Sequence, residues 1–471
     1  MEFFTLLAAV LLCLLAVALQ RSIRRARAQA ALHQIRDAAI AHRALNDNAD
    51  SFLNRPAGIF PVVMSTGLRG ERNETITTAS YGPHWRALRC NLTADVLHPS
   101  RLASLAPMQR EATRALLADV SARAQLGEVA VRGPVNAAVF GLVARLCFGD
   151  GVEGPHVRAM ERVMQELVLT VGEISAVFDG TWLARLVYRR QLRRLVGFIG
   201  RQTELYLPLI EARRKHKSRS FRSGDDIFHS YVDSLLGLGI PSDAADDVRR
   251  ALRDDELVVL VSEFLGTGTG SVVACVEWAL AHLIDQPEVQ SKLRREIDGE
   301  AVLSSKSLRG MPYLHAVVLE CLRMHPPVPF ALRGAHGEGA KVVPSAQSPV
   351  PANGLRVQFN LGDIGRDRKA WTDPDEFRPE RFLAGGEAEG VGPSPGLKEI
   401  RMMPFGAAHR HCPGMSMGML HIKCFLAAMV REFEWAPSAE DRGRGGIDMM
   451  ELDGLFKVMK RPLSACVTPR I

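Results

Sequence analysis

The sequence predicts a mainly α-helical fold in which β-sheets are small. Apolar residues recur three and four positions apart over residues 101–123, 135–147 and 190–215, which is the pattern of helices with one buried face. Residues 251–284 form a longer, almost wholly apolar stretch that must be buried. Strand signals are few, and the clearest is the alternation of apolar and polar residues over 355–361.

The composition is that of a large globular protein. The 471 residues are 47% hydrophobic and 24% charged, and no linker or internal repeat divides them. The formal net charge is +7, with basic residues concentrated at 21–27 and 213–222. No nucleic-acid-binding module accompanies these runs, so we expect a membrane surface or an acidic protein as the partner and no nucleic acid. The eight cysteines are dispersed, which predicts free thiols in a reducing compartment.

The N-terminal segment predicts a membrane anchor. Residues 3–19 are apolar apart from Thr5, and the basic run at 21–27 follows them. This order predicts a signal anchor over residues 1–28, with residues 29–471 on the cytosolic side. The competing interpretation is a cleavable signal peptide that ends near residues 28–30. Asn73 and Asn91 begin glycosylation sequons, which would be modified only if the chain entered the lumen.

A loop at residues 404–414, PFGAAHRHCPG, precedes an apolar helical stretch and carries Cys412. A cysteine just before a helix N-terminus lies where backbone N–H groups and the helix dipole lower the thiol pKa. A thiolate is what a soft metal ion or a haem iron requires. Two alternatives remain at this point: a plain buried cysteine in a turn, and a zinc site built from His409, His411, Cys412 and His421.

Three further motifs of charged or aromatic residues accompany this loop. Glu320 and Arg323 lie three residues apart on a predicted helix among apolar neighbours, which suggests a buried ion pair that needs a third partner. Arg381, in the sequence FRPERF, could be that partner. Trp85 and Arg89 lie four residues apart on a predicted helical face and could present an indole N–H and a guanidinium to an anion.

With these motifs in their order along the chain, the sequence resembles a plant microsomal cytochrome P450 and is similar to family 89. The resemblance covers about residue 38 to the C-terminus and includes the sequences NLTADVLHPSRL and MVREFEW. The family motifs align with residues 85–89 (W-x-x-x-R), 320–323 (E-x-x-R), 379–382 (P-E-R-F) and 405–414 (F-x-x-G-x-R-x-C-x-G). The resemblance implies the cytochrome P450 fold, a helical bundle around haem with small β-sheets.

The resemblance assigns a role to each matching residue. Cys412 would bind the iron of haem b as its axial thiolate, within a loop that Gly414 completes. Phe405 would pack beside the thiolate and shield it from water. The haem propionates would be held by Trp85, Arg89, Arg333 and Arg410. The network behind the haem would be structural and would consist of Glu320, Arg323 and Arg381.

The sequence departs from the family pattern at three places. The loop has Ala408 where the family has glycine. In the long apolar helix, Gly268 is kept, but Gly270 replaces the acid and Ser271 replaces the threonine that relay protons during oxygen activation. Glu263 is two helical turns from this point, too far to substitute directly. No proline precedes Pro56, which suggests a shortened N-terminal sheet region.

The resemblance implies a haem-thiolate monooxygenase anchored in the endoplasmic reticulum membrane by a single span. It would take electrons from NADPH through NADPH–cytochrome P450 reductase and insert one atom of O2 into a small lipophilic substrate. Two alternatives remain: an enzyme of the same fold that rearranges hydroperoxides, and a catalytically impaired family member that binds haem.

Overall fold

The computed structural model describes residues 32–56, 74–175, 189–223, 230–242, 245–344, 354–396, 398–452 and 454–470. The predicted anchor at residues 1–28 and the sequon asparagine Asn73 lie outside the described residues. Asn91 lies within them and is buried, with its side-chain amide donating to Ser234.

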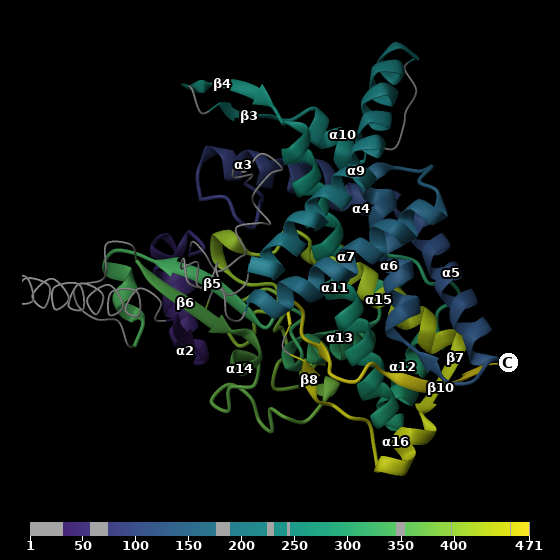
Figure 1. Ribbon diagram of the computed structural model, residues 1–471. Coiled ribbons are helices and arrows are strands. Elements are labelled where there is room, and N and C mark those ends of the chain that lie inside the picture. Colours follow the sequence, from purple (N-terminus) through teal and green to yellow (C-terminus); the bar gives the residue numbers. More distant parts are fainter. Residues whose placement is uncertain are drawn as a thin grey trace, which may run out of the picture.

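Helix α11 (Asp254–Asp285) confirms the prediction for the long apolar stretch, and it runs through the middle of the helical part of the molecule (Figure 1). Three acidic residues occupy its first turn, where they complement the helix dipole. Within the described ranges, α11 is the one helix long and apolar enough to cross a membrane, but most of it is buried in the core.

Other helices pack around α11, and those that contact it most extensively are α6, α9, α13 and α15 (Figure 1). The α-helices besides α11 are α2 (Ala38–His42), α3 (Pro83–Cys90), α4 (Pro99–Ser104), α5 (Ala106–Ala124), α6 (Arg132–Phe148), α7 (Gly154–Ser175), α9 (Arg189–Ser223), α10 (Tyr231–Leu236), α12 (Pro287–Asp298), α13 (Pro312–Met324), α14 (Leu361–Gly365), α15 (Met415–Glu432) and α16 (Ala439–Arg444). Short 3-10 and π turns are η1 (Arg43–Asp47), η2 (Ala49–Phe52), η4 (Asn91–Val96), η5 (Ser307–Arg309), η6 (Glu338–Val342), η7 (Pro379–Phe382) and η8 (Ala408–Arg410). The predicted helical segments are therefore present.

The described sheets are small, as the sequence predicts. One has the order β1 (Leu32–Ile35), β6 (Leu355–Asn360), β5 (Phe330–Ala335), and it lies to one side of the helices (Figure 1). Strand β6 alternates buried and half-buried residues, which confirms the alternation seen in the sequence. Strand β1 pairs with β6 in parallel and was not expected, because LHQI is too short to show a strand pattern.

The remaining described strands form one three-stranded sheet and two pairs. The sheet has the order β2 (Val129–Ala130), β10 (Ser464–Pro469), β7 (Phe433–Pro437). The pairs are β3 (Gly239–Ser242) with β4 (Ala245–Ala251) and β8 (Glu451–Leu452) with β9 (Val458–Met459). Sequence reasoning located strand-like pieces near 458 and 467, where β9 and β10 lie.

Two apolar cores meet at the segment that leads to Cys412. The larger core surrounds α11 and includes Met402. The smaller core lies under the β1–β6–β5 sheet and includes Met403 and Ala407. Because successive residues of one segment are buried in different cores, its backbone is held from both sides, and the loop that follows has a fixed position.

Candidate functional site

The loop around Cys412 is a tight turn that ends at α15. Gly406 and Ala408 both have positive φ angles, 73° and 56°, so the backbone reverses within a few residues. The N–H of Cys412 donates to the carbonyl of Phe405 at 2.8 Å, and the N–H of His411 donates to the carbonyl of Ala408 at 3.0 Å. Cys412 therefore lies three residues before the start of α15, as expected from the sequence.

The structure corrects the expected acidity of this thiol. Burial raises the pKa of Cys412 above its ordinary value, because a buried thiolate is poorly solvated. The N–H of Gly414 and the positive charges of Arg89 and Arg55 act in the opposite direction without reversing the shift. The position before α15 alone does not produce a thiolate, whereas coordination to a metal cation would remove the proton.

The arginines near Cys412 are Arg55, Arg89, Arg333 and Arg410. The charges of Arg55 and Arg89 act directly on the thiol. Burial, together with Arg55 and Arg410, lowers the pKa of Arg333 to about 9. Burial, together with Arg55 and Arg89, lowers the pKa of Arg410 to about 10. Burial is the main cause of both shifts, and the positive charges of neighbouring arginines add to it.

No carboxylate of the described residues acts on the pKa values of Arg89, Arg333 and Arg410. Arg55 differs from the other three arginines, because the carboxylate of Glu263 acts on its pKa. An anion with two carboxylates beside Cys412 would relieve the repulsion through charge-assisted hydrogen bonds. Haem carries two propionates and an iron that takes a thiolate ligand. The residues present therefore fit haem.

Trp85 lies between two of these arginines but does not present its N–H as expected. The Cζ atoms of Arg89 and Arg410 lie 5.8 and 4.8 Å from the centroid of the Trp85 ring. The indole N–H instead donates to the carbonyl of Ile76 at 3.1 Å, an acceptor it shares with Nη1 of Arg410 at 3.2 Å. The sequence predicted that Trp85 and Arg89 share one face of α3. It did not predict that the segment carrying Ile76 lies against Trp85.

Arg410 and Arg333 use backbone carbonyls as further acceptors. Nη2 of Arg410 donates to the carbonyl of Ala79 at 2.8 Å, and Nη2 of Arg333 donates to the carbonyl of Ala407 at 3.3 Å. A guanidinium has five N–H donors, so these bonds orient each side chain and leave donors for an anion. Arg333 comes from strand β5, which explains how a residue distant in sequence joins the cluster.

The middle of α11 has an accessible face inside an otherwise buried helix. Thr267 is exposed there, and Gly268, Gly270 and Ser271 are half-buried. The hydroxyl of Ser271 donates to the carbonyl of Thr267 at 2.9 Å, a bond within the helix. A Cβ at Gly268 would lie 3.2 Å from Cγ1 of Val143 in α6, so this glycine permits close helix packing. Ser271 thus keeps an acceptor oxygen toward the accessible face.

Glu263 joins α11 to the segment that carries Ile76. Its Oε1 accepts from the hydroxyl of Thr75 and the N–H of Thr77, both at 2.8 Å, and its Oε2 accepts from the N–H of Ile76 at 3.1 Å. Glu263 is therefore fully engaged and does not replace the missing acid at Gly270. It instead fixes the carbonyl that Trp85 and Arg410 share.

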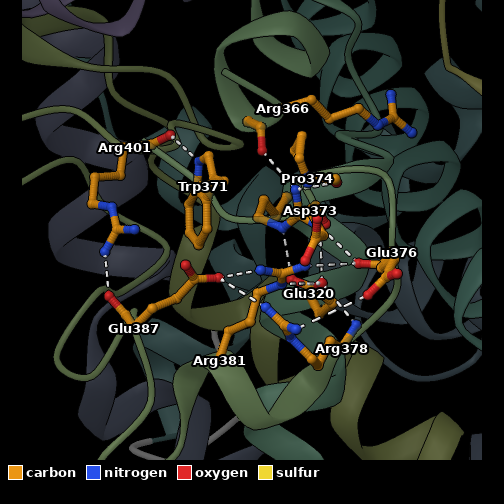
Figure 2. A network of polar contacts seen from close by, with 12 residues as sticks. Glu320, Arg366, Trp371, Asp373, Pro374, Glu376, Arg378, Arg381, Glu387 and Arg401 are labelled. Carbon is orange, nitrogen blue, oxygen red and sulfur yellow. Dashed lines mark hydrogen bonds and ion pairs between the residues drawn. The ribbon is translucent and has the colours of Figure 1, made fainter. Parts of the chain in front are cut away.

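Glu320, Arg323 and Arg381 form one buried network (Figure 2). Glu320 accepts from Nε and Nη2 of Arg323 at 2.7 and 2.8 Å and from Nε of Arg381 at 3.2 Å, and all three side chains are fully buried. Arg381 also pairs with Glu387, and the Arg323 guanidinium lies 5.0 Å from the centroid of Trp371. The third partner inferred from the sequence is thus in place.

A cavity lies beside the accessible face of α11. It has a volume of about 100 Å³ and lies between α7, α9, α11, residues 75–78 and residues 455–456. Its lining is mostly apolar and includes Met164, Leu167, Leu195, Val259 and Phe456. No sequence pattern predicts this cavity, because its walls come from five segments that are distant along the chain.

The alternative zinc site is not present. Within the described ranges, no three His, Cys, Asp or Glu side chains are close enough together to hold a metal ion. This includes His409, His411, Cys412 and His421. His421 is instead a buried side chain of α15, and burial lowers its pKa to about 4.

Comparison with known proteins decides the family. A sequence model described as cytochrome P450 matches residues 27–455. The chain is 31% identical over 452 residues to cytochrome P450 89A9 of Arabidopsis thaliana, covering 93% of this chain and 84% of that protein. It is 28% identical to cytochrome P450 98A1 of Sorghum bicolor, covering 92% and 81% of the two chains. The chain belongs to the cytochrome P450 family.

Membership of the cytochrome P450 family establishes the general activity. The protein is a haem-thiolate monooxygenase, an oxidoreductase that uses a redox partner, O2 and a small-molecule substrate. Its similarity to family 89 of the plant enzymes, inferred from the sequence, is confirmed. The observed helical fold with small sheets agrees with the fold expected for a cytochrome P450.

Sequence reasoning missed several residues of this cytochrome P450 site. Arg55 precedes a proline in a loop and belongs to no motif, yet its charge acts on Cys412. Phe456 lies far along the chain and packs against Gly270. Glu263 was noted only for its distance from Gly270, whereas its hydrogen bonds fix the carbonyl of Ile76. None of these contacts has a signature in the local sequence.

Proposed function

We propose that Cys412 binds the haem iron and that Arg89, Arg333 and Arg410 bind the two propionates. The single observation that carries this proposal is the group of arginines gathered around the half-buried thiol of Cys412. Haem, when bound, would supply the iron at which O2 is activated. Trp85 would support the propionate site through its ring, which lies beside two of the guanidinium groups.

The other predicted residues serve this site in our proposal. Phe405 and Gly414 lie on either side of Cys412, and the N–H of Gly414 acts on the sulfur, so they would shield and stabilise the thiolate. Ser271 and the two glycines, Gly268 and Gly270, would form the face of α11 that borders the reacting oxygen. Ser271 offers an acceptor oxygen there, since its proton is directed to a backbone carbonyl.

We further propose that residues 1–28 anchor the protein by a single span in the endoplasmic reticulum membrane and that residues 29–471 form the cytosolic haem domain. Electrons would come from NADPH through NADPH–cytochrome P450 reductase, and the excess of basic residues would favour docking to an acidic reductase surface. The mostly apolar cavity beside α11 supports a small lipophilic substrate.

The test uses the purified full-length protein expressed with haem supplied. Reduction under carbon monoxide should give the red-shifted Soret band of a thiolate-ligated haem, and Cys412→Ser should abolish it. Arg410→Leu and Arg333→Leu should lower the haem content without moving the band. A normal band in Cys412→Ser would refute the assigned ligand. Product formation with peroxide but not with NADPH and reductase would support the hydroperoxide-using alternative.

A further inference from the structure

Gln202 of α9 is a buried polar side chain whose Nε2 atom lacks a hydrogen-bond partner among the described residues. It is 3% exposed. The side chain lines the cavity beside α11. A buried N–H donor left unpaired is costly, so such groups in folded proteins usually await a ligand or a water.

The apolar walls of the cavity cannot satisfy this amide. Its neighbours on α9 that line the cavity are Leu195 and Ile199, and the α7 wall is formed by Met164, Leu167, Val168 and Val171. None of these side chains carries an acceptor that could take the amide proton. The amide is therefore a polar group set into an apolar surface, which is the arrangement that orients a ligand.

Apart from Ser262, the polar residues on the opposite wall of the cavity are already bonded within the protein. The Thr75 hydroxyl and the Thr77 N–H donate to Glu263, and the hydroxyl of Thr267 donates to the carbonyl of Glu263 at 2.7 Å. The hydroxyl of Thr78 accepts from the N–H of Thr75 at 2.9 Å. These contacts use the polar atoms of Thr75, Thr77, Thr78, Glu263 and Thr267 to fix the protein itself, which leaves Gln202 and Ser262 available to a ligand.

Tyr206 lies one helical turn from Gln202 and offers the nearest alternative partner. Its hydroxyl is also buried and without a partner in the described residues. Burial raises the pKa of Tyr206, and side-chain hydrogen bonding with Gln202 acts in the opposite direction, so the two polar groups lie close together. A bond in which the Tyr206 hydroxyl donates to Oε1 of Gln202 leaves the Nε2 donor for a ligand.

We propose that Gln202 is a specificity-determining residue and that the substrate is a largely apolar molecule carrying one oxygen that accepts a hydrogen bond from Nε2. A carbonyl or hydroxyl oxygen has the required chemistry. The inference rests on the proposed function, which places the substrate in this cavity. Leaving the amide unpaired should weaken binding of a pure hydrocarbon, relative to its oxygen-bearing analogue, by roughly tenfold.

The test measures binding of two matched probes, propiophenone and propylbenzene, to the full-length holoenzyme by equilibrium dialysis. These molecules differ by one carbonyl oxygen. The ratio of their affinities should fall by roughly tenfold in Gln202→Met, because methionine has nearly the same shape and no donor. It should not change in Gln191→Met, the same substitution on the same helix at a position that does not line the cavity.

Thermal unfolding of Gln202→Met without ligand gives a second readout. If the amide is unpaired in the free protein, replacing it by an apolar side chain should leave the melting temperature unchanged or raise it. A clear fall, or a misfolded variant, would show that the amide bonds within the protein and would overturn the proposal. An unchanged affinity ratio in Gln202→Met would overturn it as well.

The outcome is separable from that of the proposed function. Dialysis requires neither electron transfer nor turnover, whereas the haem assignment is tested by the carbon monoxide spectrum of Cys412→Ser. If the affinity ratio of the two probes depends on Gln202 but the red-shifted band is absent, the assignment of Cys412 as the haem ligand is refuted. The role of Gln202 in specificity is then still supported. A normal band with an unchanged ratio would refute only the role of Gln202.

Discussion

The ring of Phe456 packs directly against Gly270 in the middle of α11. A Cβ added at position 270 would lie 2.3 Å from Cε2 and 2.6 Å from Cδ2 of that ring, closer than two carbon atoms can approach. The related sequence pattern has an acid at this position. Gly270 and Phe456 therefore act as a unit, in which the ring takes the space that a carboxylate side chain would need.

Gly270→Asp should therefore lower stability rather than restore a proton relay. Forcing the side chain against the ring should cost about 1–3 kcal/mol of unfolding free energy. Combined with Phe456→Ala, the aspartate should be tolerated, so the cost of the pair should be less than the sum of the single costs. Urea unfolding of the wild type, the two single variants and the double variant measures these costs.

Coupling tests the mechanistic side of the same pair. The ratio of product formed to NADPH consumed should stay unchanged or fall in Gly270→Asp and rise only in the double variant with Phe456→Ala. Better coupling in Gly270→Asp alone would contradict the packing argument, because it would require a carboxylate at position 270 beside an unmoved Phe456.

Glu263 should stabilise the haem site through the backbone of Ile76. Glu263→Gln keeps the shape but removes the charge and one acceptor, so it should cost about 1–3 kcal/mol and speed haem loss. Thr75→Val removes one donor to the same carboxylate, and the two changes should be less than additive. Haem transfer to a competing apoprotein measures the loss rate. Equal rates in wild type and Glu263→Gln would refute this positioning role.

Glu320→Ala should be among the most destabilising single changes. It leaves the buried guanidinium groups of Arg323 and Arg381 without their carboxylate, which should cost about 3–5 kcal/mol. Glu338→Ala is the matched control, since Glu338 also pairs with a cation three residues later, Lys341, but at the surface. That pair should contribute less than about 1 kcal/mol. Similar losses in the two variants, measured by urea unfolding, would contradict the interpretation.

A buried histidine pair should make the protein sensitive to mild acid. Nε2 of His282 and Nε2 of His325 are 2.8 Å apart, and Nδ1 of His325 lies 2.8 Å from Oε1 of Glu451. Burial lowers the pKa of His325 to about 4 and that of His282 well below 6.5. Below about pH 6.5 these histidines therefore bind protons in the unfolded chain but not in the folded chain. The stability of the folded protein is complete above that pH and is lost as the pH falls toward 4.

Urea unfolding of His325→Gln between pH 7 and pH 5 tests whether the histidine pair causes this acid sensitivity. The slope of stability with pH should fall by up to about 1.4 kcal/mol per pH unit, the value for one proton. His315 and His421, whose pKa values burial also lowers to about 4, should maintain the rest of the slope. A slope unchanged by His325→Gln would show that the pair does not control acid sensitivity.

Ala408→Gly should stabilise the loop before Cys412. The φ angle of Ala408 is 56°, and an L-residue with a side chain is strained there by about 1–2 kcal/mol. Glycine relieves this but loses more chain entropy, so the net gain should be about 1 kcal/mol. Ala407→Gly is the control, because Ala407 is extended and buried and its replacement should lower stability. Parallel changes in the two variants would refute the strain argument.

Features that depend on neighbouring residues were readable from the sequence. The burial of α11 follows from an apolar run with no polar face, and the pairing of Glu320 with Arg323 follows from helical spacing. The loop of Cys412 was identified by small residues before a helix. The family resemblance added Arg333 and Arg410 as partners of one anion, which no local pattern could connect.

Features that depend on which distant segments meet were decided by the tertiary structure. Burial of Cys412 reverses the pKa shift that its place before a helix predicts, because desolvation depends on everything packed around the sulfur. Phe456 reaches Gly270, and Glu263 reaches Thr75, across more than 180 residues of chain. Local sequence determined the helices, the ion pair and the loop that carries Cys412 in this cytochrome P450. Packing decided the charge balance and the shape of its site, because electrostatic and steric energies depend on distance in space and not on separation along the chain.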